Sequence, residues 1–236
     1  GGRLSEIRGD IAGRGRLAVI GVSDGRSRIG ALPRHRAIVR SPQVARHWPL
    51  LTEAVPQCAH VAIRNSGTLG GSLALADPAA EWPACCLALD ATLILVSAKG
   101  ERHVPAREFF KGLYATALQP AELVAGVEIP LLPGHRSVFL ELSRRRGDYA
   151  IVGVAALAKR GDGRLHDVRL AYLGGGDRPV LARRAMQAAE GKPPSGDLSV
   201  ELSSDLSPMA DLENTALTKL HLANVLARRA LAALAG

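Results

Sequence analysis

The chain has 236 residues, which is enough for one large or two modest domains with hydrophobic cores. Hydrophobic residues make up 47% of it and charged residues 22%, a composition typical of globular proteins rather than disordered chains. The net charge of +8 is scattered, and aromatic residues make up only 3%, which leaves few side chains to stack on bases. We therefore expect no nucleic-acid partner, and the lack of an apolar run near eighteen residues predicts no membrane span.

The first part of the sequence predicts a hairpin followed by a helix. Residues 17–32, "LAVIGVSDGRSRIGAL", hold two short β-branched runs around Asp24-Gly25, a pair typical of tight hairpin turns. In "RSPQVARHWPLLTEAVPQC", Ser41 is a good N-cap, and Pro42 suits the first helical position because no helical partner awaits the N–H that it lacks. The histidines that flank this helix, His35 and His47, are expected at the surface or at an interface.

Strands and short helices alternate over the next stretch. We expect a helix over residues 77–91, a strand in "ATLILVS", a short helix in "VPAREFFKGL" and a strand in "ELVAGVEIP" that ends at Pro130. Asp77 is a good cap and Pro78 a good first-turn residue for the first of these helices.

The pattern changes within residues 130–137, where we place a domain boundary. "SVFLELS", "YAIVGVAALA" and "LHDVRLAYLG" predict a three-stranded antiparallel sheet. Helical patterns follow in "VLARRAMQAAEG" and over about Leu212 to Leu234. The sequence thus predicts an α+β fold with two domains, residues 1–132 and 133–236.

The three cysteines do not form a metal-binding pattern. Cys58, Cys85 and Cys86 include no Cys-x-x-Cys pair, and adjacent cysteines on a helix point in different directions. We expect them to be small apolar residues of a protein in a reducing compartment. No metal site and no catalytic acid or base is predicted.

The stretch "RNSGTLGGSLALADPAAEWP", Arg64 to Pro83, is the best candidate for a binding site. Gly70 and Gly71 permit positive φ angles and close approach of a ligand to the backbone. Successive N–H groups over residues 68–72 are then able to converge on an anion, and Asp77 and Glu81 suit sugar hydroxyls as acceptors. The alternative interpretation of the same glycine pair is a tight turn without a ligand.

Several motifs in one order make the chain resemble the FAD-binding medium subunits of molybdenum hydroxylases. This family includes aerobic carbon monoxide dehydrogenase and the xanthine, nicotinate and aromatic-heterocycle dehydrogenases. The similarity covers nearly the whole chain, and the motifs that carry it are "RIGALPRH", "SPQVARHWPLLTEAV", "IRNSGTLGGSLALADPAAEWPA", "VPAREFFKGLYATALQPAELVAGVEIP" and "ELSRRRGDYAIVGVAALA". The resemblance implies a vanillyl-alcohol-oxidase-type (PCMH) FAD-binding domain, followed by a smaller domain with a three-stranded sheet and helices.

The resemblance also implies which residues contact FAD. Glu81 falls near the ribityl or ribose hydroxyls, Val124 against the flavin, and Asp148-Tyr149 at a turn that brings an aromatic ring to the isoalloxazine. The segment that grips the pyrophosphate comprises Thr68, Leu69, Gly70, Gly71 and Ser72.

Three features differ from many relatives. Ser72 stands where many have Asn, and Glu141 stands where some have Lys near the flavin. The relatives have an earlier glycine-rich loop, upstream of the segment that matches "GRLSEIRG", and we expect this loop to be absent from the sequence. Its absence would lower FAD occupancy, because the N–H donors of the loop are lost.

The function implied is electron transfer from iron–sulphur clusters to an external acceptor within a molybdopterin-dependent dehydrogenase or hydroxylase. The partners implied are an iron–sulphur subunit and a molybdopterin-binding subunit, and the +8 charge suits an acidic partner. Residues 144–146, all arginine, are expected near the flavin or a partner contact. The expected location is the cytoplasm or the inner face of the membrane. The alternative is a truncated or flavin-free structural or assembly subunit with no redox role.

Overall fold

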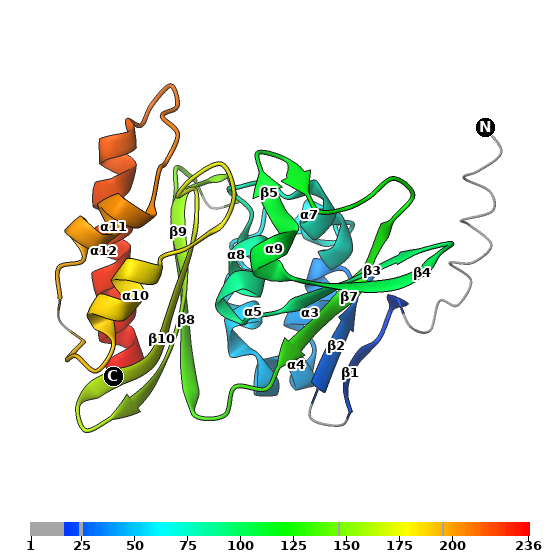
Figure 1. Ribbon diagram of the computed structural model, residues 1–236, viewed down its shortest axis with the longest axis horizontal. Helices are drawn as coiled ribbons and strands as arrows, with labels where there is room; N and C mark the ends of the chain where they lie inside the picture. Colours follow the sequence, from blue (N-terminus) through cyan, green and yellow to red (C-terminus); the bar gives the residue numbers. More distant parts are fainter. Residues whose placement is uncertain (1–16, 24–25, 146, 195) are drawn as a thin grey trace.

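The computed structural model describes residues 17–23, 26–145, 147–194 and 196–236 (Figure 1). In the first part of the chain, five strands form one antiparallel sheet in the order β1-β2-β7-β3-β4. The expected hairpin is present, with β1 and β2 paired from Ile20–Ile29 to Ser23–Arg26, while its Asp24-Gly25 turn lies outside the described residues. The strands are β1 (Ile20–Ser23), β2 (Arg26–Gly30), β3 (Thr92–Ser97), β4 (Gly100–Pro105) and β7 (Leu123–Pro130).

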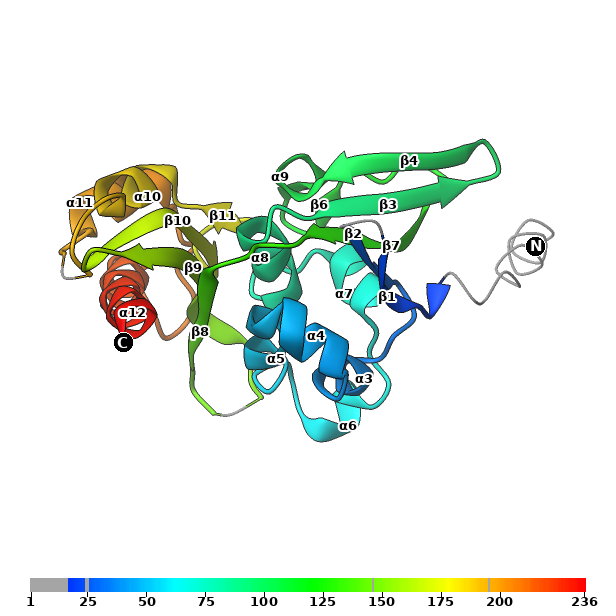
Figure 2. The ribbon, with the colours of Figure 1, turned by 90° about the horizontal axis from the view of Figure 1, so that it is seen from below.

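Short helices cover one side of this sheet (Figure 2). The helix start predicted at Pro42 is confirmed, because the Ser41 hydroxyl accepts a hydrogen bond from the Val44 N–H over 3.3 Å. The single helix expected there is two helices instead, since Trp48 precedes Pro49 and leaves the helical region. The helices are α3 (His35–Val39), α4 (Pro42–His47), α5 (Pro49–Ala54), α6 (Val61–Arg64), α7 (Leu69–Leu75) and α8 (Glu81–Ala88).

Two helix predictions in this part were wrong at their ends. The helix expected from Asp77 begins only at Glu81, because the Asp77 carboxylate instead accepts the Ala79 N–H in a turn. The helix expected in residues 104–113 is the four-residue α9 (Ala106–Phe109), after which the chain enters a small hairpin of β5 (Phe110–Gly112) and β6 (Ala115–Thr116).

The second part of the chain contains an antiparallel sheet with the order β11-β10-β9-β8. The three predicted strands are present, and a short fourth strand was missed because its residues 180–181 belong to the segment predicted as helix. It pairs Val180 with Tyr172 at the sheet edge. The strands are β8 (His135–Ser143), β9 (Ala150–Gly161), β10 (Arg164–Leu173) and β11 (Val180–Leu181).

Three helices cover the outer face of this sheet, at the left of Figure 1. The last helix begins at Ala216, later than expected, because the Thr215 hydroxyl caps it by accepting the Thr218 N–H over 3.1 Å. The helix at residues 199–205 was not predicted. The helices are α10 (Arg183–Ala189), α11 (Ser199–Asp205) and α12 (Ala216–Ala235).

Strand β8 connects the two parts because its side chains alternate between two cores. Phe139 packs with the buried residues of α5 and α8, whereas its neighbours Val138 and Leu140 pack against α12. The inner face of the second sheet therefore lies against the helices of the first part, and the outer face lies under α10–α12.

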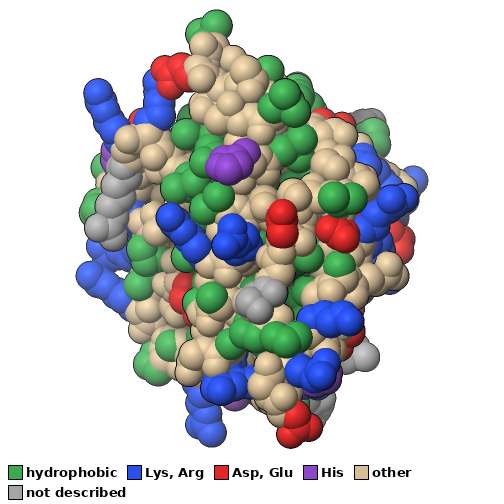
Figure 3. Space-filling model, turned by 90° about the vertical axis from the view of Figure 1, so that its left-hand side faces the viewer, with side chains coloured by type: hydrophobic (Ala, Val, Ile, Leu, Met, Phe, Trp, Pro, Cys, Tyr) green, Lys and Arg blue, Asp and Glu red, His purple; other side chains and the backbone are tan. Residues whose placement is uncertain are grey.

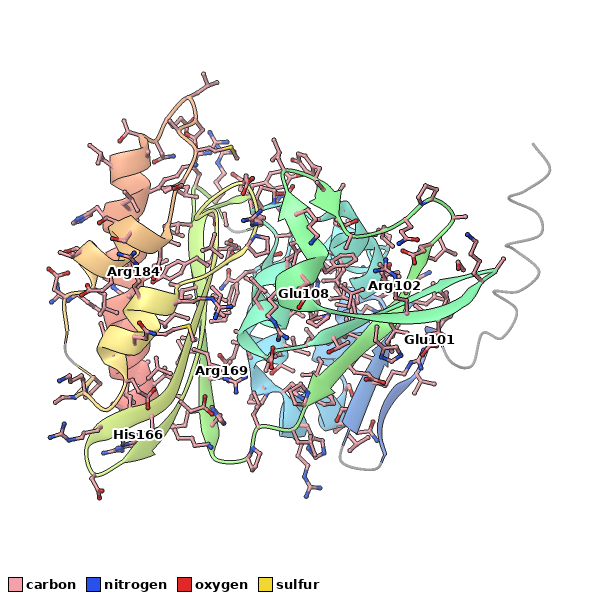
Figure 4. The ribbon with its side chains drawn as sticks, in the orientation of Figure 1. Glu101, Arg102, Glu108, His166, Arg169 and Arg184 are labelled. Atoms are coloured by element: carbon pink, nitrogen blue, oxygen red, sulfur yellow. The ribbon has the colours of Figure 1, made fainter. Side chains whose placement is uncertain are left out.

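The basic residues of the chain are spread over both parts. Figure 3 shows Lys and Arg side chains scattered among apolar and uncharged atoms over the face of the C-terminal helices. In Figure 4, Arg102, Arg169 and Arg184 come from β4, β10 and α10. This distribution differs from the basic stripe typical of nucleic-acid binding. Within the described ranges, no helix is both long and apolar enough to cross a bilayer.

Candidate functional site

A cleft of about 470 Å³ opens beside the N-terminus of α7, within the volume range of small-molecule sites. Its walls come from α6 and α7, from the segment that leads into α8, and from the turn between β8 and β9. Seven of the ten residues that the sequence singled out line it: Thr68, Gly71, Ser72, Asp77, Glu81, Asp148 and Tyr149.

The glycine pair forms the first turn of α7 rather than an open loop, which corrects the expectation of a loop with positive φ angles. Thr68 is the N-cap, and its hydroxyl accepts the Gly71 N–H over 3.1 Å. The N–H groups of Leu69, Gly70 and Ser72 also donate within the protein, to carbonyls of Pro33, Ala31 and Thr68. The neighbouring positive φ belongs to Ala76, which ends α7.

The two glycines serve different purposes. Gly70 packs against the chain that leaves β2, and a Cβ on it would lie 2.4 Å from the Ala31 Cβ. Gly71 faces the cleft, and a Cβ there would meet only the Thr68 hydroxyl, at 3.1 Å. Packing therefore requires the first glycine, and the second leaves room beside the helix terminus for a ligand.

Three of the predicted residues do not line the cleft. Leu69 is buried in the core, and Gly70 is the packing contact just described. Val124 lies on β7, where it pairs with Leu95 of β3 and packs against the core.

The acids at the entrance to α8 are held differently. Asp77 is 7% exposed, and its carboxylate accepts the Ala79 N–H over 2.8 Å and the Tyr114 hydroxyl over 3.4 Å. Burial raises the pKa of Glu81 above its usual value. Burial and the nearby charge of Glu81 raise the pKa of Glu141, on β8, to about 8.

The turn between β8 and β9 forms the opposite wall. Gly147 has a φ of +90°, and a Cβ on it would lie 2.7 Å from Nδ1 of His60, so this position requires glycine. Tyr149 is 78% exposed and stands at the cleft mouth with Asp148. Arg144 forms an ion pair with Glu213, and Arg146 lies outside the described residues.

The sequence interpretation missed His35 and Trp82, which form the floor of the cleft. His35 is 7% exposed, which corrects the expectation that it lies at the surface. The indole N–H of Trp82 donates a hydrogen bond to the imidazole ring of His35. The "EWP" stretch placed Trp82 beside a predicted site residue, but nothing local connected it to a histidine 47 positions earlier.

Comparison with known families decides what kind of protein this is. Residues 10–132 match the family described as the FAD binding domain in molybdopterin dehydrogenase, and residues 137–234 match the CO dehydrogenase flavoprotein C-terminal domain. The chain belongs to this family of flavin subunits. The resemblance drawn from its motifs, with the fold that this implied, is thereby confirmed.

Individual relatives agree with the assignment. The chain is 36% identical over 206 residues to the glyceraldehyde dehydrogenase medium chain of Sulfolobus acidocaldarius, covering 86% of this chain and 73% of the relative. It is 36% identical over 225 residues to the nicotine 6-hydroxylase medium subunit of Paenarthrobacter nicotinovorans, covering 94% and 78%. The crystal structure of quinoline 2-oxidoreductase from Pseudomonas putida 86 superimposes with a TM-score of 0.88 at 35% identity, covering 94% and 79%.

As a member of this family, the chain is a medium FAD subunit of a molybdenum hydroxylase-type oxidoreductase. The chemistry of the cleft suits FAD, because hydroxyls, carboxylates and a phenol alternate there with the apolar side chains of Ile63, Leu75 and Trp82. Because glycine has no Cβ, Gly71 leaves space beside a helix N-terminus, where a pyrophosphate is favoured.

Proposed function

We propose that this chain carries FAD and transfers electrons from iron–sulphur clusters to an external acceptor. Bound FAD supplies the redox chemistry, which the side chains of the cleft do not provide. The observation that carries the proposal is that seven residues selected from the sequence line one cleft, although they come from two distant stretches, residues 68–81 and 148–149.

In this proposal the chain binds and orients the cofactor. Thr68, Gly71 and Ser72 hold the pyrophosphate, since hydroxyl and N–H donors meet there at the start of α7. Asp77 and Glu81 accept hydrogen bonds from the sugar and ribityl hydroxyls. Tyr149, presented by Asp148 and the turn, covers the isoalloxazine.

The remaining proposed residues act through the wall of the cleft. Leu69 and Gly70 dock α7 on the sheet, and Val124 supports the wall against the flavin. We also propose that residues 1–132 form the flavin domain and 133–236 the C-terminal domain, a division that the separate cluster beneath α10–α12 supports.

The electron donor is proposed to be another chain. The sequence contains three cysteines, fewer than the four thiolates of a common iron–sulphur site, and all three are buried. We therefore propose an iron–sulphur subunit and a molybdopterin-binding subunit as partners, and the cytoplasmic location stays a prediction.

One observation favours the alternative of a flavin-free structural subunit. The N–H groups of residues 69–72 already have partners within the protein, so a phosphate must compete for them. Three of the four acceptors of these N–H groups are backbone carbonyls, and the fourth is the Thr68 hydroxyl. Because it belongs to a side chain, this hydroxyl is able to rotate away and release the Gly71 N–H.

The test is flavin binding, followed by electron transfer in the complex. The purified chain is incubated with FAD, passed through gel filtration and measured for flavin absorbance, and we expect flavin to elute with the chain. Co-expression with the genes adjacent to its own is expected to yield a complex containing iron and molybdenum in which substrate bleaches the flavin band. An active complex without flavin would instead establish the structural alternative.

A further inference from the structure

The chain that enters α3 and the chain that enters α7 run side by side at the cleft. The backbone N–H of His35 donates to the Gly67 carbonyl over 3.1 Å, and Arg34 pairs with Thr68 in an antiparallel bridge. The His35 side chain lines the cleft and is 7% exposed. A buried histidine thus lies beside the segment that is proposed to hold the pyrophosphate.

One nitrogen of the His35 ring is already engaged, and this places the proton on the other. The indole Nε1 of Trp82 donates to Nδ1 over 2.9 Å, and a nitrogen that accepts a hydrogen bond carries no proton. Burial lowers the pKa of His35 to about 4, so the ring is neutral near pH 7 and its proton is on Nε2. The two rings stack with an interplanar angle of 26°, which helps to hold the imidazole in this orientation.

The Nε2 edge of the ring lies against Gly67, which also lines the cleft. A Cβ on Gly67 would be 2.7 Å from Nε2 and 2.9 Å from Cδ2, so the imidazole occupies this position because the neighbour is glycine. Among the described residues, none accepts a hydrogen bond from Nε2, and this atom is not sealed from the open space of the cleft. A donor on a ring held in place by packing is preorganised for a ligand, since little side-chain entropy is lost on binding.

This donor supplies what the neighbouring segment lacks. The N–H groups of residues 69–72 already donate within the protein, so a phosphate that binds there needs donors that are not engaged. The Nε2–H group of His35 is such a donor, and its use breaks no hydrogen bond of the protein. A hydrogen bond to a charged phosphate oxygen is also stronger than one between neutral groups.

We propose that His35 is a further FAD-binding residue, whose Nε2–H group donates to an oxygen of the pyrophosphate. Trp82 is then a positioning residue, because its indole N–H keeps the proton of His35 on Nε2 without contacting the cofactor. The inference rests on the proposed function, since it takes the cleft as the flavin site.

The first test observes the imidazole itself, by proton–nitrogen NMR of the full chain labelled with nitrogen-15, near pH 7. The ring resonances of His35 are assigned from their loss in His35→Phe. Before ligand is added, we expect Nε2 to be protonated and Nδ1 to be unprotonated. FAD and inorganic pyrophosphate should each shift the Nε2 resonance, whereas riboflavin, which has no phosphate, should leave it in place. A protonated Nδ1, or a shift with riboflavin but not with pyrophosphate, would overturn the proposed contact.

The second test compares FAD affinities by fluorescence titration. His35→Phe keeps a ring but has no donor, and it should bind FAD about ten-fold more weakly than the wild type. This variant leaves the indole N–H of Trp82 without an acceptor, which costs stability, so the double variant His35→Phe/Trp82→Phe is measured beside it and should show the same loss. His47→Phe is the matched control, because His47 also lies beside a tryptophan, with ring centroids 5.8 Å apart, but is not among the residues that line the cleft. Its affinity should stay within about two-fold of the wild type.

Trp82→Phe tests the positioning role. Without the indole N–H, a form of His35 protonated on Nδ1 should appear in the same spectra. FAD binding should weaken less than in His35→Phe, because part of the population still presents the Nε2–H group. A ring that stays wholly protonated on Nε2 would overturn the role of Trp82.

The inference and the proposed function fail in different ways. Equal FAD affinities of the wild type and His35→Phe, or an Nε2 resonance that FAD does not move, would overturn the contact with His35 and leave the proposed function standing. A wild-type chain that binds no FAD would overturn both.

Discussion

The indole Nε1 of Trp82 donates a hydrogen bond of 2.9 Å to Nδ1 of His35, and the two rings stack with their centroids 5.5 Å apart. Because Nδ1 accepts this bond, the proton of the neutral imidazole is on Nε2. Burial, with a contribution from the positive charge of Arg64, lowers the pKa of His35 to about 4. The floor of the cleft thus holds a neutral histidine of one tautomer.

The neutral His35 should make the fold sensitive to acid. Its pKa is lower in the folded chain than the ordinary 6.5, so its contribution to stability is present above pH 6.5 and is lost as the pH falls through about 4. We expect His35 to account for a loss on the order of 2 kcal/mol in the free energy of unfolding over that interval. Urea denaturation at several pH values measures it.

His35→Gln, which cannot gain a proton, is the comparison for this acid effect. Its unfolding free energy should fall less between pH 6.5 and 4 than that of the wild type, even if the variant is less stable at neutral pH. Parallel pH profiles for the two proteins would show that His35 does not titrate as described.

Substitutions at the glycine pair should separate packing from binding. Gly70→Ala is expected to cost about 2 kcal/mol of stability, because its Cβ would meet the Ala31 Cβ at 2.4 Å and α7 would have to move off the strand. Gly71→Val should change stability by less than about 1 kcal/mol, since only the Thr68 hydroxyl is close and valine is a better helix former than glycine.

FAD binding by the second glycine variant gives the contrasting readout. The valine side chain of Gly71→Val would occupy the space proposed for the pyrophosphate, so flavin retained after gel filtration should fall at least about ten-fold. Unchanged flavin content in a folded Gly71→Val would mean that this helix start does not hold the cofactor.

Tyr149 tests the proposed contact with the isoalloxazine. It is 78% exposed, so Tyr149→Ala should alter the unfolding free energy by no more than about 0.5 kcal/mol. Loss of ring stacking should weaken FAD binding about ten-fold, and Tyr149→Phe, which keeps the ring, should bind within about two-fold of the wild type. Fluorescence titration with FAD measures the affinity of the wild type and of both variants. Equal affinities for the three proteins would mean that Tyr149 is not part of the site.

Glu53 should be important for the joint between the two parts. Its carboxylate accepts the Ser137 hydroxyl over 2.7 Å and the Phe139 N–H over 2.9 Å, which connects α5 to β8. Glu53→Ala leaves the Phe139 N–H without a partner and is expected to cost about 2 kcal/mol. Ser137→Ala removes only one of the two hydrogen bonds and should cost less than about 1 kcal/mol. Thermal denaturation measures the stability of both variants. Equal losses of stability in the two variants would argue against the hydrogen bond from the Phe139 N–H.

Much of the fold could be predicted because the signals are local. Alternating β-branched residues, a serine before Pro42 and a proline at the end of β7 act on their own neighbours in the chain. The strands β3, β7, β8, β9 and β10 therefore came out as expected. The order of the motifs along the chain was also sufficient to indicate the family of flavin subunits.

The ends of several elements depended on competing local partners. Asp77 is equally suited to cap a helix or to close a turn, and contact with Tyr114, 37 residues away, accompanies the turn. Val180 and Leu181 became a strand because β10 offers them an edge, although their sequence also fits the helix that follows.

The roles of individual site residues were decided by tertiary structure. Only the fold brings Ala31 against Gly70, so the sequence by itself could not distinguish the packing glycine from the one that faces the cleft. Only the fold encloses His35 with Trp82. The physical reason is that burial, and the charges that burial brings together, belong to neighbours far apart in the chain, whereas propensities and caps act within a few residues.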